Sequence, residues 1–176
     1  FGLTGALLPI AAQNFGANQS KRVRMALVTC WKFGWVFMFV ACPLLYCSAP
    51  LLMRILTSDL AVIDIGVSYL HVDVFLLPIY MMLFAINSFL QALKKPMWTL
   101  LIGIYRQAFG VAFFSFVFVH IWGFGVVGVW YGIATSVLTG MILSLFIANQ
   151  VALPLVGGIF SGQETRKANI SNNHPM

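Results

Sequence analysis

Four apolar runs of bilayer length constrain this chain more than any other feature of its sequence. They cover residues 25–46, 62–93, 97–121 and 129–150, and each reaches the roughly 20 residues that an α-helix needs to cross a membrane. A fifth run, residues 1–15, is too short to span fully, and we interpret it as the later half of a helix. The runs lack the alternation of an outer-membrane barrel and predict an all-α, polytopic transmembrane bundle surrounded by membrane lipid.

Composition excludes most soluble classes of protein. Of the 176 residues, 61% are hydrophobic and 8% are charged, which is far from the balance of a soluble domain. The formal net charge of +6 does not indicate a nucleic-acid partner, because the basic residues flank the apolar runs instead of forming one patch. We therefore expect an integral membrane protein and no nucleic-acid binding.

The connections between the runs carry polar and turn-forming residues. Residues 16–24 (GANQSKRVR) form a basic turn, and residues 122–128 (WGFGVVG) form a glycine-rich one. Residues 47–58 contain the apolar stretch LLMRIL and are predicted to form a short interfacial helix, after which Ser58 or Asp59 caps the next span. Residues 1–160 are thus assigned to a transmembrane unit, and residues 161–176 to a polar tail for which we expect disorder.

Basic residues sort these connections to the two sides of the membrane. Arg54 stands alone on one side, and the other basic residues of the connections and the tail fall on the opposite side. The positive-inside rule then places the 16–24 turn, the connection after residue 93 and the C-terminus in the cytoplasm. The residues on the cytoplasmic side are Lys21, Arg22, Arg24, Lys94, Lys95, Arg166 and Lys167.

The run over residues 62–93 holds an acid, Asp73, and a proline, Pro78, near its middle. At about 100° per residue, five polar or aromatic side chains lie within about 40° of the direction of Asp73, and Pro78 lies on the far side. An unpaired polar group in hydrocarbon is costly, so we predict that this face meets a cavity or partner helices while another flank meets lipid. The face, called the polar stripe below, consists of Tyr69, Asp73, Tyr80, Phe84, Asn87 and Gln91.

Five further patterns occur in a characteristic order. They are GALLPIAAQNFGANQSKRVR, RILTSDLAVIDIGVSYL, FLQALKKP, the pair Arg106 and Gln107, and GFGVVGVWYGIATSVL. Together they resemble the multidrug and toxic compound extrusion (MATE) family of secondary transporters from Phe1 to about Gln150, with Lys94 at a position where the family more often has glycine. The resemblance implies a fold of twelve helices in two six-helix lobes. This chain would then supply the end of helix eight through helix twelve, with the missing N-terminal lobe of the same chain as its partner.

The resemblance also implies a function. It predicts a secondary active efflux transporter that exchanges Na⁺ or H⁺ for drug-like organic cations or other xenobiotics by alternating access, in a bacterial inner (plasma) membrane. Two alternatives stay open: a lipid-linked oligosaccharide flippase of the same superfamily, and a non-transporting, truncated remnant. A flippase should line its cavity with several basic residues, and the apolar runs offer only Arg106 and Lys32.

Asp73 is the main candidate for ion and substrate binding. A charged side chain in the membrane costs about 2.5–3.5 kcal/mol on insertion scales, so the carboxylate needs a proton, a cation or a partner. It could bind the coupling ion and a cationic substrate in turn, or it could be a structural acid paired with His71 or another helix. Tyr80 and Asn87 are candidates to line the cavity, and Pro78 is a candidate hinge because proline removes a backbone hydrogen bond.

The remaining polar residues within the runs are given structural roles. We expect Arg106 to pair with polar groups of nearby helices, Gln91 to tie helices together, and the three cysteines to be small core residues without metal-ligand spacing. The sequence contains no pattern typical of a catalytic site, a phosphate-binding loop or a metal centre, so we expect no enzyme, no metal and no cofactor apart from the coupling ion. The structural candidates are Gln13, Asn14, Gln91, Arg106, Cys30, Cys42 and Cys47.

Overall fold

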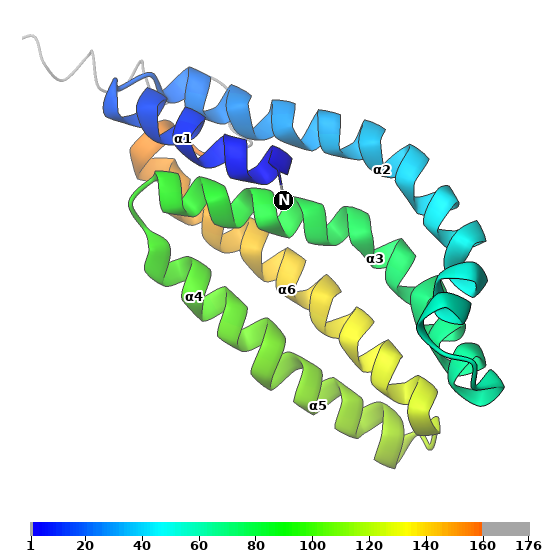
Figure 1. Cartoon of the computed structure of the whole chain (residues 1–176). Coiled ribbons are helices and arrows are strands. Elements are labelled where there is room, and N and C mark those ends of the chain that lie inside the picture. The colour runs from blue at the N-terminus through cyan, green and yellow to red at the C-terminus, as the bar shows by residue number, and fades with distance from the viewer. Residues whose placement is uncertain (1, 160–176) are drawn as a thin grey trace, which may run out of the picture.

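The computed structural model describes residues 2–159, which form helices joined by short turns (Figure 1). The long helices are α1 (Gly2–Gly16), α2 (Ser20–Leu56), α3 (Leu60–Ala92) and α6 (Gly125–Val156). Between α3 and α6 runs a further span, Pro96–Ile121, built from α4 (Pro96–Ile104), the π-helical turn η1 (Tyr105–Gly110), α5 (Val111–Phe116) and a second π-helical turn, η2 (Val117–Ile121). By length and composition, α2, α3, Pro96–Ile121 and α6 can each cross a membrane. The predicted all-α transmembrane bundle is confirmed, and the chain is an integral membrane protein.

The observed helix boundaries differ most from expectation in α2. Residues 47–58 were predicted to form a separate interfacial helix, whereas α2 continues through Pro43 and Pro50 to Leu56. A proline disrupts hydrogen bonding only locally, and a long membrane helix can continue past it. Similarly, α6 begins at Gly125 and runs to Val156, so the glycine-rich turn is shorter than expected. The predicted tail, residues 161–176, lies outside the described residues.

The two ends of α3 follow known capping chemistry. Asp59 caps the N-terminus, and its carboxylate accepts a hydrogen bond of 2.9 Å from the Ala61 N–H, as one of the two sequence alternatives predicted. After the last turn, Lys94 has a φ of 59°. This left-handed conformation explains why glycine suits that position, because glycine adopts it without steric cost. Pro96 then opens α4, where its missing N–H costs nothing.

Helix α3 is the central element of the described bundle. It packs against α1, α2, α4 and α6, and Figure 1 shows it running between α1 and α2 on one side and α6 on the other. Its later half contributes Ile86, Phe89 and Leu90 to the fully buried core. The position of α3, and of the side chains that it carries, is therefore fixed by helices from both ends of the described chain.

Helix α6 carries small residues at every fourth position. All of them are buried, and because successive members lie about one turn apart, they form a slowly winding face along which neighbouring helices can approach closely. A Cβ atom added at Gly132 would lie 2.6 Å from the backbone nitrogen of Ser115 in α5. The face, called the small-residue face below, consists of Gly128, Gly132, Ser136, Gly140, Ser144, Ala148 and Ala152.

At two levels of this contact, a serine of one helix packs against a glycine of the other. Ser115 of α5 packs on Gly132 of α6, and its hydroxyl donates to the Val129 carbonyl oxygen at 3.5 Å. One turn further along, Ser136 of α6 occupies the space beside Gly110 in η1. The two helices are thus joined by close backbone contact together with interhelical hydrogen bonds.

Candidate functional site

The polar stripe of α3 is only partly covered by the described helices. Tyr80, Phe84 and Asn87 are half-buried, as are Tyr69 and Asp73, and Gln91 is exposed. Other positions in the same turns are buried against neighbouring helices, among them Leu83, Ile86 and Leu90. In the earlier half of α3, Phe75 points away from the stripe and is 72% exposed, so that flank is free to meet lipid. In the later half, the stripe is half-buried between positions that are buried against neighbouring helices.

Tyr80 and Arg106 meet across two helices. The Arg106 guanidinium carbon lies 5.4 Å from the centroid of the Tyr80 ring, within the range of a cation–π interaction. The two residues lie at similar depth, since Tyr80 is roughly 18 Å from the end of α3 and Arg106 roughly 15 Å from the start of α4 at 1.5 Å per residue. The predicted pairing of Arg106 with a neighbouring helix has this form in the structure.

The backbone around Arg106 is held by α6. Ser136 Oγ donates a hydrogen bond of 2.6 Å to the Arg106 carbonyl oxygen. A Cβ atom at Gly140 would lie 3.2 Å from Arg106 Cγ and Cδ, so the absence of a side chain there makes room for the arginine stem. Arg106 also belongs to the π-helical turn η1, and such turns in α-helices occur frequently at functional sites.

Asp73 lies on the same face as Tyr80, two turns earlier in α3. It is close enough to interact electrostatically with Tyr69 and Tyr80. Within residues 2–159 its carboxylate has no hydrogen bond and no ion pair. His71, the partner considered in the structural alternative, instead stacks on Tyr46 of α2 with ring centroids 4.0 Å apart.

Asn87 presents an unused acceptor. Its Oδ1 atom is buried and has no hydrogen-bond partner among the described residues, while its backbone oxygen accepts a hydrogen bond of 3.4 Å from Thr99 Oγ1 in α4. Buried polar atoms normally have partners, so an unpaired side-chain oxygen on the stripe is a place where a ligand donor or a water can bind.

Pro78 lies within the continuous helix α3 and faces away from the stripe. Proline has no N–H to donate to the carbonyl of Val74, four residues earlier. The Cys42 thiol of α2 lies 3.5 Å from that Val74 oxygen and donates to it. The structure therefore gives Cys42 a specific role, which is to satisfy a backbone group that the proline leaves free.

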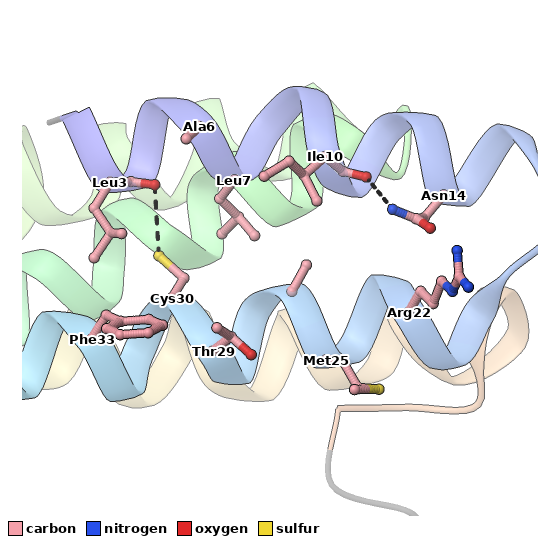
Figure 2. A pocket seen from close by; sticks show the side chains of 11 residues that line it. Leu3, Ala6, Leu7, Ile10, Asn14, Arg22, Met25, Thr29, Cys30 and Phe33 are labelled. Atoms are coloured by element: carbon pink, nitrogen blue, oxygen red, sulfur yellow. Dashed lines mark hydrogen bonds between the residues drawn. The ribbon is translucent and has the colours of Figure 1, made fainter.

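The other predicted polar residues lie apart from the stripe. Gln13 is exposed and Asn14 half-buried in the last turns of α1. The Asn14 side-chain amide donates to the Ile10 carbonyl oxygen of its own helix at 2.8 Å (Figure 2). Cys30 is buried and its thiol lies 3.9 Å from the Leu3 oxygen, while Cys47 is exposed. The structure does not bring Gln13 or Asn14 together with Asp73 and Tyr80.

Sequence reasoning did not find Ser136, Gly140 or Thr99 as supports of the site. The spacing of small residues in α6 was a usable signal, because four-residue spacing marks a face on which helices approach closely. The Thr99 hydrogen bond had no comparable signal, since it depends on how α4 returns against α3.

The fold and the site define a polytopic α-helical membrane protein with a half-buried polar face on its central helix. The MatE family model matches residues 1–117, which is most of the chain. The chain belongs to the MatE family, as the sequence resemblance predicted.

A solved structure supports the same fold. It is described as the inward-facing conformation of a multidrug resistance MATE family transporter of the MOP superfamily, and it aligns with a TM-score of 0.82 at 18% sequence identity. The alignment covers 88% of this chain and 36% of that one, so the chain corresponds to about a third of that transporter. A search of curated proteins gave no match.

Proposed function

We propose that this chain forms part of a secondary active efflux transporter that exchanges Na⁺ or H⁺ for organic cations or other xenobiotics. The observation that carries the proposal is the polar stripe, a face at membrane depth that combines the acid Asp73, the aromatic Tyr80 and the unpaired oxygen of Asn87. Membership of the MatE family supports it. The proposed setting is a bacterial inner membrane with the C-terminus in the cytoplasm and a second lobe facing the stripe.

The chemistry of the stripe suits alternating occupancy by cations. A carboxylate at this depth is stabilised when it binds a proton, Na⁺ or a cationic substrate, because a lone charge in the membrane costs about 2.5–3.5 kcal/mol on insertion scales. Tyr80 can contribute about 0.5–2 kcal/mol to a flat cation through its ring. Asn87 Oδ1 can accept a hydrogen bond from the same substrate.

The proposed cycle follows from competition for Asp73. In the outward-open state the inward-moving ion binds the carboxylate and releases the substrate. In the inward-open state the ion leaves and a cytoplasmic substrate takes its place. Binding of either cation lowers the free energy of one state relative to the other, which is what couples their movements.

The flippase alternative receives less support from the arrangement. A cavity for a lipid-linked pyrophosphate needs several basic groups. Arg106 lies against the stripe at Tyr80, whereas Lys32 is an exposed residue of α2. A single guanidinium is too few for a polyanionic substrate, and the acid Asp73 on the stripe favours a cationic one.

Replacing Asp73 tests the proposal. In the full-length protein reconstituted in vesicles, Asp73→Asn should abolish efflux of a fluorescent organic cation or make it independent of the Na⁺ and H⁺ gradients. Asp64→Asn is the matched control, because Asp64 is an exposed residue near the start of the same helix, and it should transport as the wild type does.

Two outcomes would contradict the proposal. Wild-type efflux with unchanged ion dependence in Asp73→Asn removes the carboxylate from the mechanism. Failure of the wild type to move any cation under either gradient, with the protein folded and monodisperse, rejects efflux itself and favours the non-transporting alternative.

A further inference from the structure

A groove runs between α1 and α2, away from the polar stripe. It has a volume of about 410 Å³ and is shown in Figure 2. Both helices contribute to it: Leu3, Ala6 and Ile10 from α1, and Ala26, Thr29 and Phe33 from α2. The Cys30 thiol, 3.9 Å from the Leu3 carbonyl oxygen, links the two helices near the end closest to the N-terminus.

The groove opens onto an apolar outer surface. Ile10 is 49% exposed and Phe33 is 63% exposed, and the next turn of α2 adds the exposed Val36 and Phe37. Apolar side chains exposed on a membrane-spanning helix are stable where they meet acyl chains or another apolar surface. The groove therefore offers a channel for a hydrocarbon chain.

Its opposite end is basic. Arg22 lies at that end and extends toward Asn14 in Figure 2. Arg22 is exposed and forms no ion pair within residues 2–159. Lys21 precedes it, and residues 16–24, which join α1 to α2 and open α2, contain no acidic residue. A guanidinium is well suited to a phosphate, because its planar N–H groups can donate two parallel hydrogen bonds to the oxygens.

The dimensions match one leaflet of a bilayer. From Arg22 to Phe33 the groove follows eleven residues of α2, or roughly 16 Å at 1.5 Å per residue. Half of a hydrocarbon core of roughly 30 Å is about the same length. A phosphate held at Arg22 would thus sit at the headgroup level while its acyl chain reached the middle of the membrane.

We propose that the groove between α1 and α2 binds an anionic phospholipid of the leaflet on the side of the α1–α2 connection. One acyl chain lies along Ala6, Ile10 and Thr29, and the headgroup phosphate binds Arg22. Charge complementarity favours this occupant over a neutral lipid, and basic pockets between membrane helices on the cytoplasmic side commonly bind anionic headgroups.

Binding of phosphatidylglycerol and phosphatidylcholine to the purified, full-length protein tests the proposal, with native mass spectrometry as the measurement. Wild type should bind phosphatidylglycerol more tightly than phosphatidylcholine. Arg22→Gln should weaken phosphatidylglycerol binding about fivefold, which is the effect of losing one basic contact near a membrane surface. Lys95→Gln, which removes an exposed basic residue at another connection, should bind as the wild type does.

A second pair of variants tests the acyl-chain channel. Ala6→Trp fills the groove and should displace the lipid, whereas Ala12→Trp places the same side chain on an exposed position of α1 outside the groove. Equal binding of the two lipids by the wild type overturns the proposal. So does full phosphatidylglycerol binding by folded Arg22→Gln or Ala6→Trp, which would mean that the lipid lies elsewhere or that another part of the protein covers the groove.

Discussion

The contact between Tyr80 and Arg106 places a positive charge on the aromatic ring that the polar stripe would offer to a substrate. At 5.4 Å the guanidinium occupies one face of that ring. A flat organic cation approaching Tyr80 would meet Arg106 either as a neighbour on the opposite face or as a competitor. If the stripe binds cations as proposed, Arg106, for which the sequence suggested a structural pairing, would also change their affinity.

Two substitutions of Tyr80 separate its ring from its hydroxyl group. Tyr80→Phe keeps the ring and should leave the KM for an organic cation close to the wild-type value. Tyr80→Leu removes the ring and should raise KM about two- to thirtyfold, which corresponds to a cation–π interaction of about 0.5–2 kcal/mol. Vesicle transport at graded substrate concentrations measures both, and an unchanged KM in Tyr80→Leu would exclude the ring from substrate binding.

Individual residues of the stripe could be predicted, but their partners could not. The direction of Asp73, Tyr80 and Asn87 depends on helical periodicity, which is a local property of the sequence. The approach of Arg106 to Tyr80 depends on how two helices pack and where a π-helical turn rotates the side chain. A contact between residues of two different helices produces no pattern of regular residue spacing in the sequence.

Among the helices, α3 shows how a proline can be accommodated without a break. The Val74 carbonyl that Pro78 leaves free accepts from Cys42 of α2, so the helix continues while one of its backbone groups is bonded to a neighbour. A bend of α3 at Pro78 would move the Val74 carbonyl relative to the Cys42 thiol that donates to it. Pro78 and Cys42 therefore belong to one structural unit.

Pro78→Ala should impair transport cycling more than expression. The alanine restores the N–H donor to Val74 and stiffens α3 at mid-membrane. The expected result is normal yield and thermal stability with a clearly lower maximal efflux rate. Unchanged efflux would count against a hinge, and Pro154→Ala, near the end of α6, serves as a control proline substitution.

The close contact between α6 and α5 at Gly132 can also be tested. Gly132→Ala forces a Cβ atom to within 2.7 Å of the Ser115 Cα atom, so the helices must separate. We expect a loss of about 1–3 kcal/mol in stability, as for other overpacked cores. Gly103→Ala is the matched control, because a Cβ there meets nothing within 4 Å. Thermal unfolding in detergent should separate the two variants, and equal melting temperatures would contradict the close contact.

Helix ends were predictable where side chains mark them. Asp59 before α3 and Pro96 at the start of α4 could be recognised because each performs a local task, capping a helix in one case and opening a helix in the other. The break expected after residue 46 was wrong because Pro50 and the polar residues nearby do not stop a helix that neighbours support. Packing of α2 against α3 and α1 decides its course, and that packing is not encoded locally.

At the scale of the whole molecule, the succession of long apolar runs made the helical fold predictable. Long apolar runs separated by polar or glycine-rich turns specify helices and their alternating direction, and the MatE match and the solved structure agree with that arrangement. The crossing order of the helices, with α3 in the centre, could be approached only through the family resemblance.

The orientation of the bundle can be tested by labelling. In a variant without native cysteines, Ala17→Cys should be protected from a membrane-impermeant maleimide added outside intact cells, while Ser58→Cys should react. Both positions are exposed and lie at opposite ends of α2. The reverse pattern would invert the topology derived from the positive-inside rule.

The length of α2 has a consequence for the membranes in which this protein can work. Its 37 residues extend roughly 55 Å, and even a tilt of about 40° leaves roughly 42 Å to place across a hydrocarbon core of about 30 Å. Yet the last two residues of α2, which follow Arg54, are apolar, with Ile55 73% and Leu56 77% exposed. Figure 1 shows α2 curving in its later half, which allows this end to turn toward the membrane plane. Bilayer thickness would then set how far α2 must bend, so lipids of different acyl length should shift the conformational balance through hydrophobic mismatch.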